Sequence, residues 1–237
     1  MSKIELPPLP EPFEPTREAL HRVAEDVIKV AREHVTGEFS LQSTPGGFGT
    51  PEWSDGNQIR VEGVELVVVR DGAEQRAPIT SLAAATQQIG SDWMPQGQEL
   101  SDDPLALDPA AAEALAAAFA LGEAALERIR ASAGPGDEPT EPTLWPEHFD
   151  IAIEMGPDGS GLRANYGLAP GDESHPEPYF YVGPWSAKPA GELWNGSGFT
   201  GAELGYGEMV AAEDPVAAAV EFSLERRIAL EGMKEDR

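Results

Sequence analysis

The side chains that could do chemistry gather in the second half of the chain. Residues 147 to 154 read EHFDIAIE, residues 162 to 167 read LRANYG, and residues 175 to 185 read HPEPYFYVGPW. If these stretches are strands, alternate side chains lie on opposite faces of a sheet. One face is then apolar and contains Ile151 and Phe180. The other face or its border carries the candidate binding residues His148, Asp150, Arg163, Asn165, Tyr179, Tyr181 and Trp185.

This predicted face has the composition of a polar recognition surface. Rigid aromatic rings supply contact area, and the polar side chains supply directed hydrogen bonds. Trp185 would form a wall of the site if it is exposed beside the tyrosines. The simpler interpretation is a solvated sheet face, because antiparallel sheets commonly face water on one side.

An enzymatic interpretation uses some of the same residues. His148 would act as a general base with Asp150 as its orienting group, and Arg163 would contact an anionic substrate. His175 and Glu177 could join the first two as ligands of zinc. Such pairs arise easily by chance, however, and the sequence has no HExxH motif. The sequence therefore predicts neither a metal nor a cofactor, and it leaves open whether the protein is an enzyme.

Other catalytic motifs are incomplete or missing. GSGFTG at residues 196 to 201 satisfies the GxGxxG pattern, but no strand is predicted before it and glycines follow where a helix should open. No serine lies in a GxSxG elbow. The absence of cysteine excludes thiolate chemistry and disulfides. These searches favour a binding protein.

The charge of the chain restricts its partners. The sequence has 16 Lys and Arg residues against 42 Asp and Glu residues, a formal net charge of -26. A surface of this sign repels nucleic acid and anionic lipid, since both are bound through clusters of Lys and Arg. The partners that remain are a basic protein or a small-molecule ligand.

The sequence also predicts a cytoplasmic protein. The first 15 residues contain a cluster of prolines and lack the apolar run of a signal peptide. No stretch approaches the roughly 18 apolar residues of a membrane span. With 4 lysines against 12 arginines and abundant Ala, Gly and Pro, the composition is typical of a high-GC bacterial genome.

The elements that must position the candidate site follow from the period of the apolar residues. Thr16 is predicted to cap a helix that Gly37 ends, with His34 on its buried side. Several short strands with glycine turns follow. A later helix, opened by Asp108-Pro109, presents one packing seam. That seam consists of Leu115, Phe119, Gly122, Leu126 and Ile129.

The predicted fold is α+β, with antiparallel meanders packed against amphipathic helices. A proline-rich arm, residues 1 to 15, precedes an N-terminal α+β half at residues 16 to 130. An acidic stretch rich in Pro and Gly, residues 131 to 142, is typical of a linker. The C-terminal half, residues 143 to 237, combines a meander with a terminal helix. The two halves form two subdomains or complete one sheet.

Together these observations predict a non-enzymatic binding or interaction protein that uses the polar aromatic sheet face of its C-terminal half. Two alternatives remain open. One is the small-molecule enzyme with His148, Asp150 and Arg163. The other is an acidic inhibitor of the immunity or decoy type, which would bind a basic partner by charge complementarity. The sequence does not determine the oligomeric state.

Overall fold

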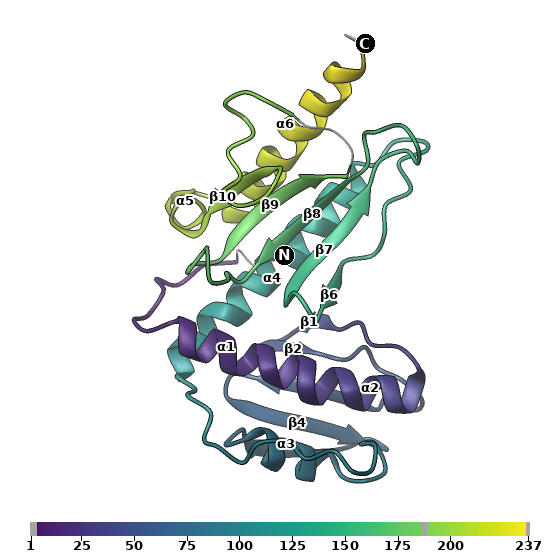
Figure 1. Cartoon of the computed structure of the whole chain (residues 1–237), viewed down its shortest axis with the longest axis vertical. Helices are drawn as coiled ribbons and strands as arrows, with labels where there is room; N and C mark the ends of the chain where they lie inside the picture. Colours follow the sequence, from purple (N-terminus) through teal and green to yellow (C-terminus); the bar gives the residue numbers. More distant parts are fainter. Residues whose placement is uncertain (1–3, 186–188, 236–237) are drawn as a thin grey trace. The chain divides into compact units, whose positions relative to one another are not determined.

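Two antiparallel five-stranded sheets, each with its own helices, make up the protein (Figure 1). The structure, a computed structural model, describes residues 4–185 and 189–235. One compact unit consists of Pro8–Ala120 and Leu144–Phe149, here the N-terminal unit. The other consists of Met1–Pro7, Leu121–Thr143 and Asp150–Arg237, here the C-terminal unit. The predicted α+β class is confirmed. The predicted boundary at residues 131 to 142 remains a prediction.

The sheet of the N-terminal unit is a simple meander in the order β1-β2-β3-β4-β5. Its strands are β1 (Gln42–Thr44), β2 (Gly47–Gly49), β3 (Gln58–Glu62), β4 (Glu65–Arg70) and β5 (Ala73–Pro78). The register pairs Phe48 with Val61 and Val61 with Leu66, and all three side chains are buried. Alternation therefore gives this sheet one apolar face, as its sequence predicts.

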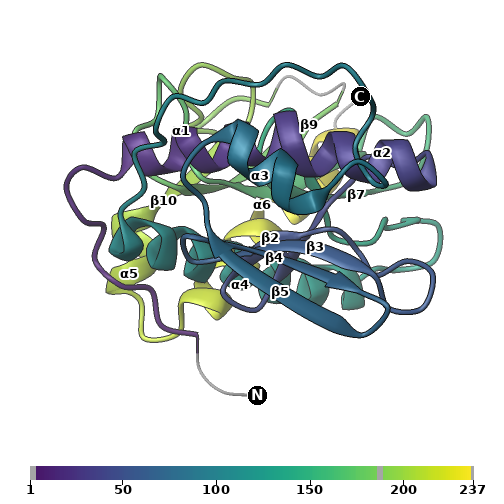
Figure 2. The ribbon, with the colours of Figure 1, turned by 90° about the horizontal axis from the view of Figure 1, so that it is seen from below.

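Helices of the N-terminal unit lie over this sheet (Figure 2). A continuous helix consists of α1 (Glu14–Arg22), the π-helical segment η1 (Val23–Ile28) and α2 (Lys29–Thr36); α3 (Leu82–Ile89) lies beside it. Gly37 ends the long helix with a left-handed φ of 76°, and Ser81 caps α3 by accepting a hydrogen bond from the amide of Ala84. The end at Gly37 agrees with the sequence prediction.

The beginning of the long helix differs from the prediction. The helix starts at Glu14, and Thr16 lies inside it, so Thr16 is not its cap. The Thr16 hydroxyl instead donates to the carbonyl of Ala106 and accepts from the amide of Asp108. His34 is exposed, which contradicts the buried position predicted for it. The π-helical turn of η1 contains one more residue than an α-helical turn. Because each residue of an α-helix is rotated by about 100° around the axis, this extra residue moves the later side chains to a different side of the helix.

The sheet of the C-terminal unit has the order β10-β9-β8-β7-β6. Its strands are β6 (Thr143–Trp145), β7 (Asp150–Met155), β8 (Ala164–Ala169), β9 (Tyr179–Pro184) and β10 (Ala202–Gly205); the other helices are α4 (Pro109–Ala131), α5 (Tyr206–Ala211) and α6 (Pro215–Glu235). The sequence predicts the helices α4 and α6 and three strands, the first of which is divided in the structure into β6 and β7 by the turn at residues 146–149. It misses β10 and α5, which lie in a glycine-rich region.

Gly122 allows α4 to approach the C-terminal sheet closely. A Cβ at this position would lie 2.7 Å from Cγ2 of Ile151 and 3.0 Å from Cβ of Leu168. Leu126 and Ile129, which follow Gly122 on the same side of α4, are fully buried. The predicted seam is therefore a packing surface. On the other helix of this layer, Phe222 of α6 packs edge-on against Phe180 of β9.

The prediction that no stretch approaches the length of a membrane span is wrong for α4, which among the described residues is the one helix long and apolar enough to cross a membrane. This property concerns length and composition only. Within the folded chain, 61% of its apolar window is buried, as in the core helix of a soluble protein. Asp108 caps its first turn by accepting a hydrogen bond from the amide of Ala111, as the sequence predicts.

The predicted linker is tied to the C-terminal unit by a buried charge. Asp137, 7% exposed, pairs with Arg227 of α6 at 2.6 Å. Its backbone carbonyl accepts a hydrogen bond from the amide of Gly156. Residues 131 to 142 therefore include a packed connection, because a free linker would leave its charged groups in water.

Candidate functional site

The C-terminal sheet separates apolar from polar side chains as its sequence predicts. Ile151 and Ile153 of β7, Tyr166 of β8 and Phe180 of β9 are at most 1% exposed on the inner face. On the outer face, Gly167 of β8 lies directly between Ala152 of β7 and Tyr181 of β9, and Tyr181 also pairs with Glu203 of β10. Small residues beside each tyrosine leave space for the aromatic rings.

Tyr181 lies across Gly167 and reaches the carboxylate of Asp150. A Cβ at Gly167 would be 2.6 Å from the Tyr181 hydroxyl oxygen and 2.7 Å from its ring carbons. The hydroxyl donates to Oδ2 of Asp150, which is 8% exposed. Three neighbouring strands therefore fix one phenol and one carboxylate at the centre of the outer face.

His175 lies between two further carboxylates. Its Nε2 is 3.1 Å from Oε2 of Glu203, and its Nδ1 is 3.4 Å from Oδ1 of Asp172. The same Asp172 oxygen accepts hydrogen bonds from the amides of Ser174 and His175, which fixes the loop before β9. The side chain of His175 is 15% exposed, although the sequence predicts an exposed loop residue. It is only partly exposed because its ring packs on Tyr179, with 4.5 Å between ring centroids.

Four aromatic rings form a contiguous group on this face, in which three rings lie near one another and the fourth contacts Tyr179. Tyr179 and Tyr181 lie 6.2 Å apart, and the ring of Phe199 lies 6.3 Å from each. His175 is the fourth ring. We call these residues and their carboxylates the acidic aromatic cluster. It consists of Asp150, Asp172, His175, Tyr179, Tyr181, Phe199 and Glu203.

Burial and negative charge dominate the electrostatics of the cluster. Burial raises the pKa of the Tyr181 hydroxyl well above its usual value, and the charge and hydrogen bond of Asp150 raise it further. The pKa of Tyr179 is also raised, first by burial and then by the charges of Asp172, Glu203 and Asp150. Burial alone would raise the pKa of Asp172, but backbone amides and His175 together hold it below its usual value. Asp172 therefore stays ionised and the two phenols stay neutral at neutral pH.

Three of the predicted binding residues form a separate group on the same sheet. The indole N–H of Trp185 donates to Oδ1 of Asn165 at 2.6 Å, and the guanidinium of Arg163 lies 5.2 Å from the Trp185 ring. Arg163 also pairs with Glu154 at 3.1 Å and donates to the carbonyl of Gly156. Trp185 is 54% exposed. Arg163 therefore already has a carboxylate partner and an aromatic neighbour.

His148 is not a strand residue, and its prediction on the polar face is wrong. It is exposed in the turn at residues 146–149 and belongs to the N-terminal unit. Strand β7 begins only at Asp150, after Phe149 with a positive φ of 56°. Because the extended backbone is interrupted at Phe149, strand alternation does not place the His148 side chain beside Asp150.

The sequence misses several members of the cluster. Asp172, Phe199 and Glu203 are absent from the predicted binding residues, and for His175 the sequence suggests only a metal ligand or an exposed loop position. Asp172 and Phe199 lie in loops, and Glu203 lies on the unpredicted strand β10. Within residues 4–185 and 189–235, no group of three or more His, Asp or Glu side chains could hold a metal ion.

A second polar sheet face belongs to the N-terminal unit. Arg60 and Arg76 alternate there with Glu62 and Glu74, with Arg60 pairing with both glutamates at 2.7 Å. The hydrogen bonds to Glu62 and Glu74 raise the pKa of Arg76. Both arginines are already paired with glutamates, Arg76 also with Glu65 at 3.8 Å, so this group has the character of a structural ion-pair network.

The chain matches no protein-family model, no curated protein and no solved structure in the comparisons.

Proposed function

We propose that the protein is a binding module whose acidic aromatic cluster recognises a cationic group of a basic protein partner. One observation carries this proposal. Four contacting rings are bordered by three carboxylates, with His175 as the one basic side chain in the cluster. Lys and Arg side chains are attracted both to carboxylates and to the faces of aromatic rings.

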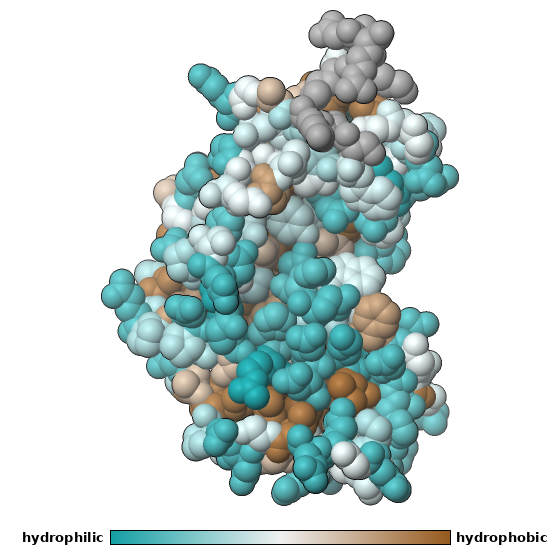
Figure 3. Space-filling model, viewed as in Figure 1, coloured by the Kyte–Doolittle hydropathy of each residue, from teal (hydrophilic) through white to brown (hydrophobic). Residues whose placement is uncertain are grey.

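The charge of the whole chain supports the same partner. A net charge of -26 attracts a basic surface over a distance limited by salt screening. Hydrophilic side chains predominate on the face of the molecule shown in Figure 3, with apolar ones between them. The net negative charge of the chain would therefore attract a basic partner, and the acidic aromatic cluster would bind it. An acidic inhibitor of the immunity or decoy type would use the same chemistry. The cytoplasmic location and bacterial origin remain predictions from composition.

The test is a titration of the protein with the peptide triarginine, followed through the ring signals of Tyr179, Tyr181 and Phe199 in NMR spectra. We expect shifts confined to the cluster and a dissociation constant that rises with salt. Glu203→Gln keeps the side-chain shape but removes one charge, and should weaken binding about threefold. Glu141→Gln changes an exposed carboxylate of the same unit outside the cluster and should leave binding unchanged.

Two results would contradict the proposal. One is equal binding of triglutamate, because the cluster should repel it. The other is unchanged triarginine binding in both Glu203→Gln and Phe199→Ala, which would place the peptide elsewhere on the acidic surface. Circular dichroism of each variant verifies that the fold is retained.

A further inference from the structure

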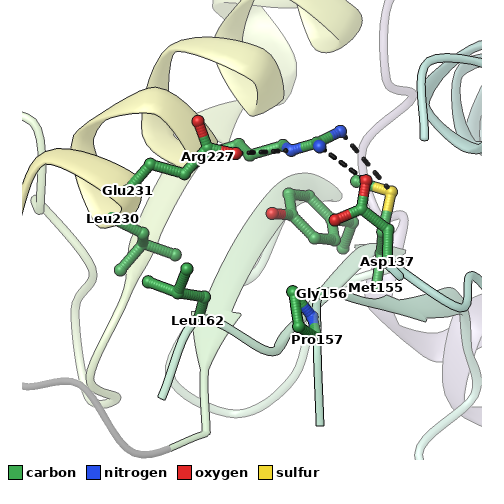
Figure 4. A pocket seen from close by; sticks show the side chains of 9 residues that line it. Asp137, Met155, Gly156, Pro157, Leu162, Arg227, Leu230 and Glu231 are labelled. Carbon is green, nitrogen blue, oxygen red and sulfur yellow. Dashed lines mark hydrogen bonds and ion pairs between the residues drawn. The ribbon is translucent and has the colours of Figure 1, made fainter. Parts of the chain in front are cut away.

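A pocket lies in the C-terminal unit between α6 and the end of strands β7 and β8 (Figure 4). Its volume is about 160 Å³. Its apolar walls come from Met155, Pro157, Leu162 and Leu230. Leu230 is 1% exposed while its neighbour Glu231 is exposed, so the pocket leads from the surface into the core of the unit.

The charged groups of the pocket are already paired with one another. Arg227 donates to Asp137 at 2.6 Å and to Glu231 at 3.2 Å, as Figure 4 shows. A further Arg227 nitrogen donates to the carbonyl of Ser132 at 3.4 Å. One guanidinium thus meets two carboxylates, and the local charge does not favour an anion.

Tyr166 contributes the one uncharged hydroxyl among the lining residues. This residue is 1% exposed and lies on the inner face of β8. Burial raises the pKa of Tyr166 to about 12, Arg227 lowers it, and Asp137 and Glu231 raise it, so the hydroxyl is within range of the pocket charges. Within residues 4–185 and 189–235 it makes no hydrogen bond to the protein. The hydroxyl is not among the described side-chain atoms that are both fully buried and without a partner, so it remains accessible to a ligand or water in the pocket that Tyr166 lines.

Gly156 keeps one wall of the pocket close to the backbone. It has a φ of 123°, and a Cβ here would lie 2.7 Å from the carbonyl oxygen of Leu162. A larger residue would therefore strain the loop that joins β7 to β8 and displace its neighbours. The chain is built tightly around this pocket, yet leaves the pocket itself unfilled by side chains.

We propose that this pocket binds a small, uncharged and mostly apolar molecule that carries one hydroxyl or carbonyl group, which hydrogen bonds to Tyr166. The volume supports this class, since a cavity of about 150 Å³ accommodates benzene. Four apolar side chains would surround the body of the ligand, and the phenol would orient its polar group. This inference is independent of the proposed recognition of a basic partner, because none of the pocket residues belongs to the acidic aromatic cluster.

Phenol and benzene are the matched probes for this pocket, titrated into the full-length protein. We expect phenol to shift the methyl signals of Met155, Leu162 and Leu230 in NMR spectra and to bind more tightly than benzene. Tyr166→Phe should weaken phenol binding about tenfold, the value of one net hydrogen bond, and leave benzene binding unchanged. Tyr206→Phe is the control, since that hydroxyl donates to the carbonyl of Pro7 outside the pocket.

Two outcomes would overturn the inference. If neither probe shifts these methyl signals at its solubility limit, the pocket holds solvent only. If phenol binds equally to the wild type and to Tyr166→Phe, the hydroxyl does not orient the ligand. Leu162→Phe gives a second check, because a ring that fills the pocket should abolish binding of both probes while the cluster keeps its response to triarginine.

Discussion

The hydroxyl of Tyr181 on β9 donates to Oδ2 of Asp150 on β7, although strand β8 runs between them. Gly167 on β8 makes this contact possible because the Tyr181 ring occupies the space where a Cβ would be. The central pair of the acidic aromatic cluster thus depends on three strands and on the absence of one side chain. Substitutions at these positions test whether the cluster has the geometry described.

Removal of the Tyr181 hydroxyl should destabilise the protein. In Tyr181→Phe, the buried carboxylate of Asp150 loses this donor, at an expected cost of about 1 to 3 kcal/mol in the free energy of unfolding. Tyr179→Phe is the matched control. Its hydroxyl contacts an exposed Asp172 at 3.4 Å, so the change should be within about 0.5 kcal/mol. Urea denaturation measures the free energy of unfolding of both variants. Equal losses would mean that the hydrogen bond from Tyr181 to Asp150 contributes little to stability.

A methyl group at Gly167 should displace the Tyr181 ring. Ala is otherwise the better residue in a strand, but its Cβ at this position would overlap the phenol. We expect Gly167→Ala to lower stability by about 1 to 3 kcal/mol and to change the Tyr181 ring signals. Gly183, in the neighbouring strand β9, has open space around its own Cβ position. A similar loss in Gly183→Ala would indicate a general effect on the sheet.

Two helix glycines should respond to alanine in opposite directions. Gly122→Ala gains helix propensity but places its Cβ 2.7 Å from Ile151, so we expect a net loss of about 1 to 2 kcal/mol. Gly232 in α6 is exposed, and nothing lies within 4 Å of its Cβ position. Gly232→Ala should therefore raise stability by up to about 1 kcal/mol. Thermal unfolding of the two variants tests the sign, and stabilisation by both would contradict the packing of α4.

The tyrosines predict the response of the protein to alkali. All four have raised pKa values, and burial is the main cause at each; those of Tyr166 and Tyr206 are about 12. A raised pKa in the folded state means that stability is complete below pH 10 and falls as the pH rises through the folded-state values. Tyr166 alone accounts for about 2 to 3 kcal/mol of this loss. Phenolate absorbance should therefore develop above pH 10 together with unfolding. A tyrosine that titrates near its usual pKa in the folded protein would contradict this burial.

Strand alternation made part of the site predictable from the sequence. The period-2 patterns near Asp150, Asn165 and Tyr181 assign these side chains to the outer face. Successive side chains of a strand point to opposite faces of the sheet, so apolar and polar residues that alternate are separated. The inner face and the seam of α4 follow from the same reasoning. The failure at His148 has a local cause. Phe149 has a left-handed backbone, and nothing in its residue type signals this conformation.

The remaining members of the cluster depend on pairing between distant segments. Glu203 meets His175 across 28 residues of sequence, and it does so from a strand between two glycine-rich stretches. Such a contact requires the register of β10 against β9, which local patterns do not determine. The pocket at Tyr166 was unpredictable for a related reason. A buried tyrosine in a strand is ordinarily core, and only its packing shows that it lines a pocket.

The composition of the N-terminal unit determines when this unit can fold during synthesis. Its segment Leu144–Phe149 supplies the Leu41–Leu144 bridge and the Phe149 ring, which packs edge-on against Phe48 and Phe119. A nascent chain therefore cannot complete this core until residue 149 has left the ribosome. Its hydrophobic surface stays only partly covered until then, so a stop just after α4 would release an unfinished domain.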